Sequence, residues 1–348
     1  MMTAASRADD VRALIDHRLG ALMERESQGA AFLGPDGQEV IRSFLVDFVA
    51  AGGKRLRPSF VYWGHRAAGG SPDDEETVLL AGCAVELMHT CALLLDDIMD
   101  EAGTRRGRTT AHLALAERHR RRHWRGDPRR YGESVATLLA MLAFTWADAA
   151  LLRGGVPRAA WEVFTRLRVE IIGGQYLDLS SAAAGRGDFE EAVRISTYKS
   201  GKYTVERPLH LGHAIAGGDP ALRATLSAYA LPLGEAFQLR DDVLGVFGDP
   251  ARTGKPSGTD LLQGRRTYLT AETRRRAGPP GTALLDGVRD AAGVAAARDL
   301  IVTTGALDTV ERRISALVTE ATGNLAGLPP DAAAALTDLA RAATDRNA

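Results

Sequence analysis

The stretch VLLAGCAVELMHTCALLLDDIMD, residues 78–100, joins a long apolar run to three aspartates at its end. Four acidic residues at 73–76 precede it, and acidic side chains stabilise the positive N-terminal end of a helix. The sequence therefore predicts a helix over about 74–101. Because the run contains Glu86 and His89, a buried helix fits it better than a membrane span. Cys83 and Cys91 would lie about 12 Å apart on this helix, which is too far for a disulfide.

Helical patterns separated by Gly or Pro continue on both sides of this stretch. We expect helices at about 7–27, 37–50, 132–153, 157–181, 188–200, 202–216, 219–247, 260–276, 293–303, 307–325 and 330–345. No segment shows an apolar–polar alternation long enough to predict a strand, and no low-complexity linker divides the chain. The sequence therefore predicts a single all-α domain over residues 1–348.

The composition excludes some classes of function. The chain has 43 basic and 44 acidic residues among 348, so a whole-surface field for nucleic acid or anionic lipid is not expected. Seven arginines gather at 118–130, and we interpret this segment as a solvated surface loop rather than a nucleic-acid site. The N-terminus has no apolar stretch of the signal-peptide type. We expect a reduced, cytoplasmic, soluble protein without a transmembrane segment.

The first acidic cluster is Asp96, Asp97 and Asp100. Three carboxylates at the C-terminal end of a helix repel one another and face the negative end of the helix dipole, so a positive partner is expected. Arg105 and Arg106 follow at once. A solvated helix end with local ion pairs is one explanation. The other is a site for hard divalent cations and a substrate that carries phosphate.

The second acidic cluster lies on the apolar helix expected at 231–247, which carries Gln238, Asp241 and Asp242. Asp249, Lys255 and Asp260 follow among glycines. If this helix faces the first cluster, five carboxylates could hold several Mg²⁺ ions around a diphosphate, because Mg²⁺ takes a few carboxylates together with phosphate oxygens and water.

Basic residues form short clusters elsewhere. The turn Gly52–Pro58 contains Lys54, Arg55 and Arg57, and Lys199 and Lys202 flank Gly201. Cations at a helix start are mildly unfavourable, so a bound anion would explain them, but a basic surface turn would as well. His89 shares a helix face with Asp96. A lone histidine on such a face is more often a core residue than a ligand.

These motifs, in this order, resemble the trans-isoprenyl diphosphate synthase (polyprenyl synthetase) family over about residues 40–270. The matching residues are Gly52–Pro58, Glu86, His89, Asp96–Asp100, Arg105–Gly107, Gly174-Gln175, Lys199–Gly201, Phe237–Asp242, Gly248–Pro250, Thr253–Lys255 and Asp260. The resemblance implies an all-α isoprenoid synthase fold of roughly a dozen helices around a central cavity, usually as a homodimer. It also implies Mg²⁺-dependent condensation of isopentenyl diphosphate with an allylic diphosphate.

The resemblance also implies residue roles. Mg²⁺ ions on the allylic diphosphate would be held by Asp96, Asp97, Asp100, Asp241 and Asp242. The oxygens of that diphosphate would be neutralised by Arg105, Lys199 and Lys255. Isopentenyl diphosphate would be bound by Lys54, Arg57, His89 and Arg106. The allylic cation would be oriented or shielded by Ser200 and Gln238.

The chain departs from the family pattern at four places: Gly245 stands where the second motif usually ends in aspartate, Leu95 where histidine is common, Ala140-Met141 where Gly-Asp is common, and Arg265 where lysine is frequent. We expect the metal cluster to survive the Gly245 change. Met141 either reshapes the cavity wall or packs in the core, and core packing is the favoured interpretation.

Product length depends in this fold on the residues one turn before the first aspartates, here Cys91 and Ala92. Both are small, so the tail should pass them and reach Met88, with Met141 and Phe144 on the neighbouring helix closing the cavity. This predicts a C20 product, geranylgeranyl diphosphate, with C15 or a longer chain as the alternatives. Two other functions stay open: a class I terpene cyclase on the same scaffold, and a non-catalytic partner subunit of a prenyl diphosphate synthase.

Overall fold

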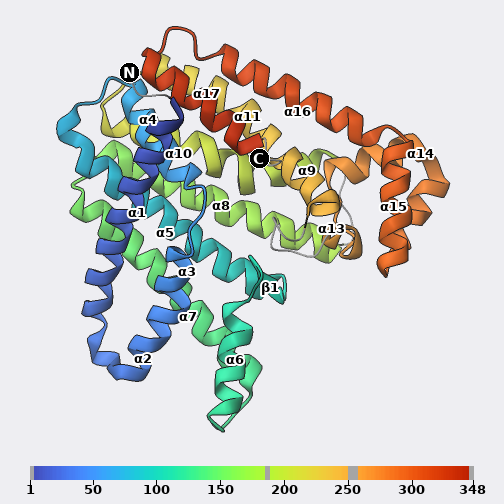
Figure 1. Ribbon diagram of the computed structural model, residues 1–348, viewed down its shortest axis with the longest axis horizontal. Coiled ribbons are helices and arrows are strands. Elements are labelled where there is room, and N and C mark those ends of the chain that lie inside the picture. The colour runs from blue at the N-terminus through green and yellow to red at the C-terminus, as the bar shows by residue number, and fades with distance from the viewer. Residues whose placement is uncertain (1–3, 185–188, 250–257, 345–348) are drawn as a thin grey trace. The chain divides into compact units, whose positions relative to one another are not determined.

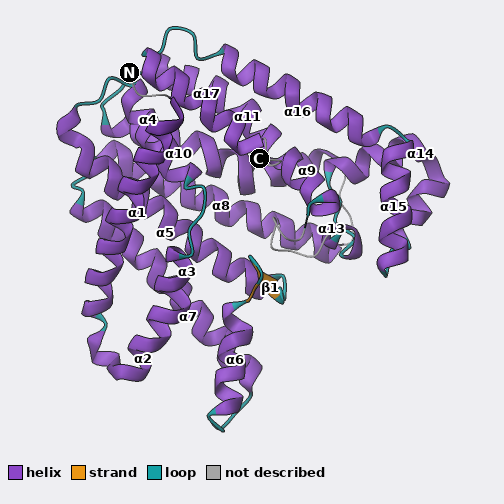
Figure 2. Cartoon of the chain, in the orientation of Figure 1, coloured by secondary structure: helices purple, strands orange, loops and turns teal. Residues whose placement is uncertain are grey.

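The computed structural model describes residues 4–184, 189–249 and 258–344, which form helices joined by short turns (Figure 1). The contacts divide the chain into two compact units. Unit 1 comprises Met1–Glu162 with Pro208–Gly218, and unit 2 comprises Val163–Arg207 with Asp219–Ala348. Among the described residues only β1 (Thr104–Arg105) and β2 (Arg108–Thr109) are strands, and they pair as a small antiparallel hairpin (Figure 2). The predicted all-α class is confirmed, while one domain over 1–348 stays a prediction.

Unit 1 contains the first acidic motif and the N-terminal helices. Its elements are α1 (Ala4–Gly29), η1 (Ala31–Leu33), α2 (Gly34–Ile41), the π-helix η2 (Arg42–Val46), α3 (Asp47–Ala50), α4 (Leu56–Ala67), η3 (Pro72–Asp74), α5 (Glu75–Met99), the β-hairpin, α6 (Ala111–Arg121), α7 (Pro128–Arg153), the start of α8 (Arg158–Ala184) and most of α10 (Arg207–Ile215).

Unit 2 contains the second acidic motif. Its elements are the rest of α8, α9 (Phe189–Ser196), the π-helix η4 (Thr197–Glu206), α11 (Pro220–Phe247), α13 (Thr259–Leu262), α14 (Tyr268–Asp286), α15 (Ala291–Thr303), α16 (Ala306–Gly323) and α17 (Pro330–Thr344).

The long helices begin where the sequence supplies a cap. Asp127 accepts a hydrogen bond from the N–H of Arg129 at the start of α7, and Asp219 accepts one from Leu222 at the start of α11. Each cap is followed by a proline at the first helical position, where its missing N–H costs nothing. Local sequence thus sets the N-terminal ends of both helices.

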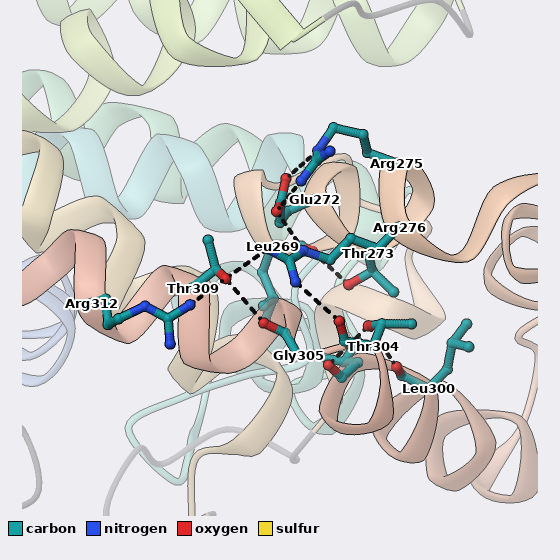
Figure 3. A network of polar contacts seen from close by, with 11 residues as sticks. Leu269, Glu272, Thr273, Arg275, Arg276, Leu300, Thr304, Gly305, Thr309 and Arg312 are labelled. Atoms are coloured by element: carbon teal, nitrogen blue, oxygen red, sulfur yellow. Dashed lines mark hydrogen bonds and ion pairs between the residues drawn. The ribbon is translucent and has the colours of Figure 1, made fainter.

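The C-terminal helices α14, α15 and α16 pack around an aliphatic core in unit 2. Polar contacts connect their ends (Figure 3). Arg275 and Arg276 donate to the carboxylate of Glu272, and Arg276 also reaches the carbonyl of Thr304 and the hydroxyl of Thr309. The ion pairs of Glu272 lie within α14, and hydrogen bonds from Arg276 join this helix to the end of α15 and to α16, in addition to the apolar packing.

The arginine-rich segment 118–130 differs from the sequence expectation. The structure extends α6 to Arg121 and begins α7 at Pro128, so only a short turn lies between them. His119 is buried there against the rings of Trp124 and Tyr131. The segment is largely solvated, as predicted, since residues 120–127, 129 and 130 are exposed, but it is a loop only over 122–127, so the loop prediction was wrong at 118–121 and 128–130.

Candidate functional site

The first acidic cluster lies at the C-terminal end of α5. Arg105 of β1 donates from Nε to Oδ1 of Asp97 at 2.7 Å and from Nη2 to Oδ2 of Asp96 at 3.0 Å. Asp97 is buried and Asp96 half-buried. Asp100 caps the helix and is also half-buried. The local ion pairs that the first of the two explanations requires are therefore present. They hold two carboxylates side by side at the end of an apolar helix.

Two basic turns meet beside this helix. The guanidinium of Arg106 donates to the carbonyl of Gly52, and a β-carbon on Gly53 would lie 3.6 Å from Nη2 of Arg106. The turn after α5 is thus tied to the turn before α4, which carries Lys54 and Arg57. Lys54 is exposed and Arg57 is half-buried.

Arg55 in the same turn has a different role from its neighbours. Its side chain points inward, where it forms ion pairs with Asp16 at 2.8 Å and Glu86 at 2.5 Å and donates to the carbonyl of Val49 at 2.7 Å. Its backbone is left-handed, with φ of 47°. Arg55 is a structural cation, so of the three basic residues in this turn only Lys54 and Arg57 are candidates for ligand binding.

His89 lies on α5 between the acidic cluster and these basic turns. Burial of the ring, and then the charges of Arg57, Arg106 and Arg105, lower the pKa of His89 well below its usual value. Burial and nearby arginines likewise lower the pKa of Arg106, against the opposing charge of Glu86. His89 is half-buried and lies near these cations. Positive charge concentrated in this way is typical of an anion site.

The second acidic cluster lies near the C-terminal end of α11. Gln238 donates to Oδ1 of Asp242 at 2.8 Å, and the N–H of Tyr268, in the first turn of α14, donates to Oδ2 at 3.1 Å. Asp242 is only 6% exposed. Burial raises its pKa to about 7, with further increases from Asp260 and Asp241 that the Gln238 bond opposes. Asp241, by contrast, is half-buried.

Gly245 explains how Asp260 joins this cluster. A β-carbon on Gly245 would overlap Oδ2 of Asp260, so that carboxylate occupies the space beside Gly245, one turn along α11 from Asp241. From the sequence, position 245 only lacks the aspartate that is usual there, and Asp260 has no predicted site role. The signal that could have indicated the position of Asp260 is a glycine at 245 followed by an aspartate in the next segment.

Lys199 and Ser200 lie in the π-helix η4. The helix α8 approaches so closely that a β-carbon on Gly174 would be 2.7 Å from the backbone nitrogen of Lys199. The ammonium of Lys199 is 2.6 Å from Oδ2 of Asp178 on α8, an acidic partner that the sequence did not indicate. Ser200 is half-buried, and Lys255 lies outside the described residues.

The residues expected to control product length lie on two helices. Cys91 and Met88 are buried on α5, and Ala92 is half-buried. Cys83 and Cys91 form no disulfide with each other, as expected. Met141 on α7 is 59% exposed. The favoured interpretation of Met141 as core packing was therefore wrong, because this face of α7 points away from the interior of unit 1.

No group of three or more His, Cys, Asp or Glu side chains arranged to hold a metal ion is found within residues 4–184, 189–249 and 258–344. The chemistry of the donors nevertheless suits Mg²⁺. Both clusters consist of carboxylates, and Mg²⁺ is usually held by one or two carboxylates together with substrate phosphates and waters rather than by an all-protein cage.

Comparison with known proteins adds an independent finding. Residues 38–297 match the sequence model of a family described as polyprenyl synthetase. A short chain isoprenyl diphosphate synthase of Methanothermobacter thermautotrophicus is 31% identical over 66% of this chain and 65% of its own. A geranylfarnesyl diphosphate synthase of Aeropyrum pernix is 31% identical over 81% of this chain and 85% of its own. A geranylgeranyl pyrophosphate synthase from Corynebacterium glutamicum, solved with isoprenyl diphosphate and magnesium, superposes with a TM-score of 0.91 at 36% identity, covering 97% of this chain and 99% of that one.

Proposed function

We propose, because this chain belongs to the polyprenyl synthetase family, that it is a trans-prenyltransferase. It condenses isopentenyl diphosphate head-to-tail with an allylic diphosphate and forms a longer trans-prenyl diphosphate. The relatives carry names of this activity.

One observation within unit 1 carries the proposal. A pair of carboxylates and a separate group of cations lie on and beside the same helix, α5: Asp96 and Asp97 at its end, and Arg57 and Arg106 around His89. Carboxylates bind a diphosphate through metal ions, whereas arginines bind it directly. Two modes of diphosphate binding fit a reaction with two diphosphate substrates. A terpene cyclase has one such substrate and would not need the second group.

The cation group is the proposed site for isopentenyl diphosphate. Arg57 and Arg106 donate to its oxygens, Lys54 adds charge from the exposed side of the turn, and His89 is neutral because of its lowered pKa. A neutral imidazole can donate one hydrogen bond without the cost of another buried charge. The site therefore binds an anion through fixed donors and needs no metal.

The acidic residues are the proposed sites for the allylic substrate. The carboxylates that would hold Mg²⁺ are Asp96, Asp97, Asp100, Asp241 and Asp242, and we add Asp260. When bound, Mg²⁺ supplies positive charge that stabilises the leaving diphosphate. Arg105 and Lys199 neutralise its oxygens further. That both acidic clusters serve the same diphosphate stays a prediction of the sequence.

The chemical step needs no nucleophile from the protein. The allylic C–O bond ionises, the double bond of isopentenyl diphosphate attacks the resulting cation, and a proton is then lost to the departing diphosphate. Cationic side chains stabilise the charge that develops on the leaving group, which is electrostatic catalysis. Ser200 and Gln238 are proposed to orient or shield the cation. The amide of Gln238 also donates a 2.8 Å hydrogen bond to Asp242. Gln238 is therefore proposed both to shield the cation and to orient a carboxylate of the second acidic cluster.

We propose a C20 product. Cys91 and Ala92, one turn before Asp96, are small and leave the path along α5 open as far as Met88.

We also propose a homodimer and a cytoplasmic location. Two helices, Pro72–Met99 and Pro128–Arg153, are long and apolar enough to cross a membrane, and 78% and 44% of their most apolar windows are buried. A core helix of a soluble protein has these properties, and the exposed apolar face of α7 supports contact with a second copy.

The proposal is tested with purified protein, Mg²⁺ and isopentenyl diphosphate. Dimethylallyl, geranyl and farnesyl diphosphate are supplied in turn, and product length is read by mass. We expect a single C20 diphosphate. A hydrocarbon or alcohol released without use of isopentenyl diphosphate would indicate a cyclase. No turnover of any starter would indicate a partner subunit.

A further inference from the structure

The helix α15 carries none of the residues assigned above, yet two of its side chains reach the second acidic cluster. Arg298 donates to the carbonyl of Val246 from Nε at 2.9 Å and from Nη2 at 2.6 Å. Val294, one turn earlier, lies so close to Gly258 that a β-carbon there would be 2.5 Å from its Cγ1. One face of α15 therefore contacts both the end of α11 and the start of α13.

These two contacts flank the Gly245–Asp260 pair. Val246 follows Gly245 in α11, and Gly258 lies two residues before Asp260. The N–H of Gly258 also donates to the carbonyl of Gly245 at 3.2 Å. Any shift of α13 away from α11 would therefore break a backbone hydrogen bond and withdraw the Asp260 carboxylate from Gly245. α15 contacts α11 at Val246 and the start of α13 at Gly258, and so opposes such a shift.

Arg298 also has an electrostatic effect at this end of α11. The last carbonyls of a helix lack partners within it and form the negative end of its dipole, here close to Asp241 and Asp242. Arg298 pairs with one of these carbonyls and places a positive charge among them. Its guanidinium lies 6.0 Å from the ring centroid of Phe247, the last residue of α11, and this contact further restrains the helix end.

We propose that Arg298 is a positioning residue, which holds the end of α11 and, with Val294, keeps Asp260 against Gly245 so that the second acidic cluster binds metal-bound diphosphate. Arg298 lies just beyond residues 38–297, which match the family model. The inference rests on the proposed function. Arg298 is proposed to act through the carbonyl of Val246 and the ring of Phe247, and not as a ligand.

The test compares Arg298→Met with Arg298→Lys. Methionine keeps the apolar stem but no donor, whereas lysine keeps the charge and one bond. Binding of Mg²⁺ with inorganic diphosphate is measured by the thermal shift it causes, and kinetics are measured in parallel. We expect Arg298→Met to need about tenfold more Mg²⁺ for half of the maximal shift, since outer partners of metal ligands typically contribute 10- to 100-fold. Arg298→Lys should recover part of this loss.

Arg276→Met is the matched control. Arg276 also donates to a helix-terminal carbonyl, that of Thr304, at 3.1 Å, and it lies in the same unit among the contacts of Figure 3. This change should lower thermal stability without altering the Mg²⁺ requirement. If Arg298→Met lowered stability and left the Mg²⁺ requirement at the wild-type value, the positioning role would be refuted.

Asp260→Asn provides a second variant if Arg298→Met does not fold. It should raise the Mg²⁺ requirement to a similar extent, and in the Asp260→Asn background Arg298→Lys should add little. Additive effects would contradict the inference. Failure of the proposed function is distinguishable, because the wild-type protein would then make no prenyl diphosphate, whereas failure of this inference leaves an active wild type.

Discussion

Oδ2 of Asp260 lies where a β-carbon of Gly245 would be. In the family pattern an aspartate commonly ends the second motif at this position. Here the helix supplies space instead, and the carboxylate reaches it from α13. A side chain at 245 would collide with this carboxylate, so Gly245 leaves the space that Asp260 occupies.

Gly245→Asp should consequently impair the enzyme although it restores the family's usual residue. The new side chain would displace Asp260 and place two carboxylates in the space of one. We expect a fall in kcat of about tenfold or more and a higher Mg²⁺ requirement, since misplaced outer ligands typically cost 10- to 100-fold. The double variant Gly245→Asp with Asp260→Gly should recover part of the activity, as measured by steady-state kinetics.

The control for this change is Gly20→Ala in α1, where no atom lies within 4 Å of the added carbon. It should leave activity and the Mg²⁺ requirement as they are. Full activity in Gly245→Asp would show that Asp260 can move without consequence.

Arg106→Gln should raise KM for isopentenyl diphosphate far more than KM for the allylic substrate. Loss of a charge-assisted contact costs about 1.5–3 kcal/mol, which corresponds to a rise of roughly 10- to 100-fold. Arg108→Gln, in the other strand of the same hairpin, is the matched control and should change neither value. An equal rise of both KM values would refute a separate site for isopentenyl diphosphate.

Cys91→Phe or Ala92→Phe should shorten the product. Each places an aromatic ring on α5 one turn before Asp96, and mass analysis should find C15 in place of C20. Cys91 is buried, so its replacement also costs about 1–3 kcal/mol of stability through overpacking. Met99→Phe, at an exposed position on the same helix, should leave product length unchanged. The same chain length in both test variants would mean that this part of α5 does not limit the tail.

Leu138→Lys combined with Met141→Lys should convert a dimer into a monomer. The two side chains are 62% and 59% exposed and lie one turn apart on α7, so charges there would disrupt an apolar contact with a second copy. Sedimentation equilibrium measures the mass directly. Val302→Lys, another exposed aliphatic position, should have no effect. A dimer that persists in the double variant would place the contact elsewhere.

Glu272 gives the C-terminal helices a pH-dependent stability. Hydrogen bonds from Arg275, opposed by burial and aided by Arg276, lower the pKa of Glu272 to about 2, compared with about 4.3 in an unfolded chain. Because the folded pKa is the lower one, the stabilisation is complete above about pH 4.3 and is lost as the pH falls towards 2. Arg275 is largely exposed, so solvent screens the pair and we expect only a small contribution to stability.

Denaturant unfolding of wild type and Glu272→Gln measures this contribution. The wild type should be the more stable at pH 7, and the difference should shrink by pH 3.5. A difference that does not change between these two pH values would assign the effect to packing rather than charge.

Much of the fold was predictable because its signals are local. The acids at 73–76, Asp127-Pro128 and Asp219-Pro220 act within one turn of the helix that each begins, and apolar residues spaced by three and four mark the buried faces. The order of acidic and basic motifs was equally visible in the chain. The packing of His119 against Trp124 and Tyr131 was not visible, although these residues are close in sequence, because ring contacts depend on the path of the turn between α6 and α7.

The sequence by itself determined the all-α class, the caps that begin α7 and α11, and the chemistry of the candidate residues. Only the tertiary structure decided which charged side chains are available for a ligand: Arg55 turns inward to Glu86, while Lys54 beside it stays exposed. It alone put Met141 on an outer face and Asp260 beside Gly245. The physical reason is the distance along the chain over which each interaction acts. Propensities and caps act over about four residues, whereas burial and charge pairing depend on helices that the chain brings together from far apart.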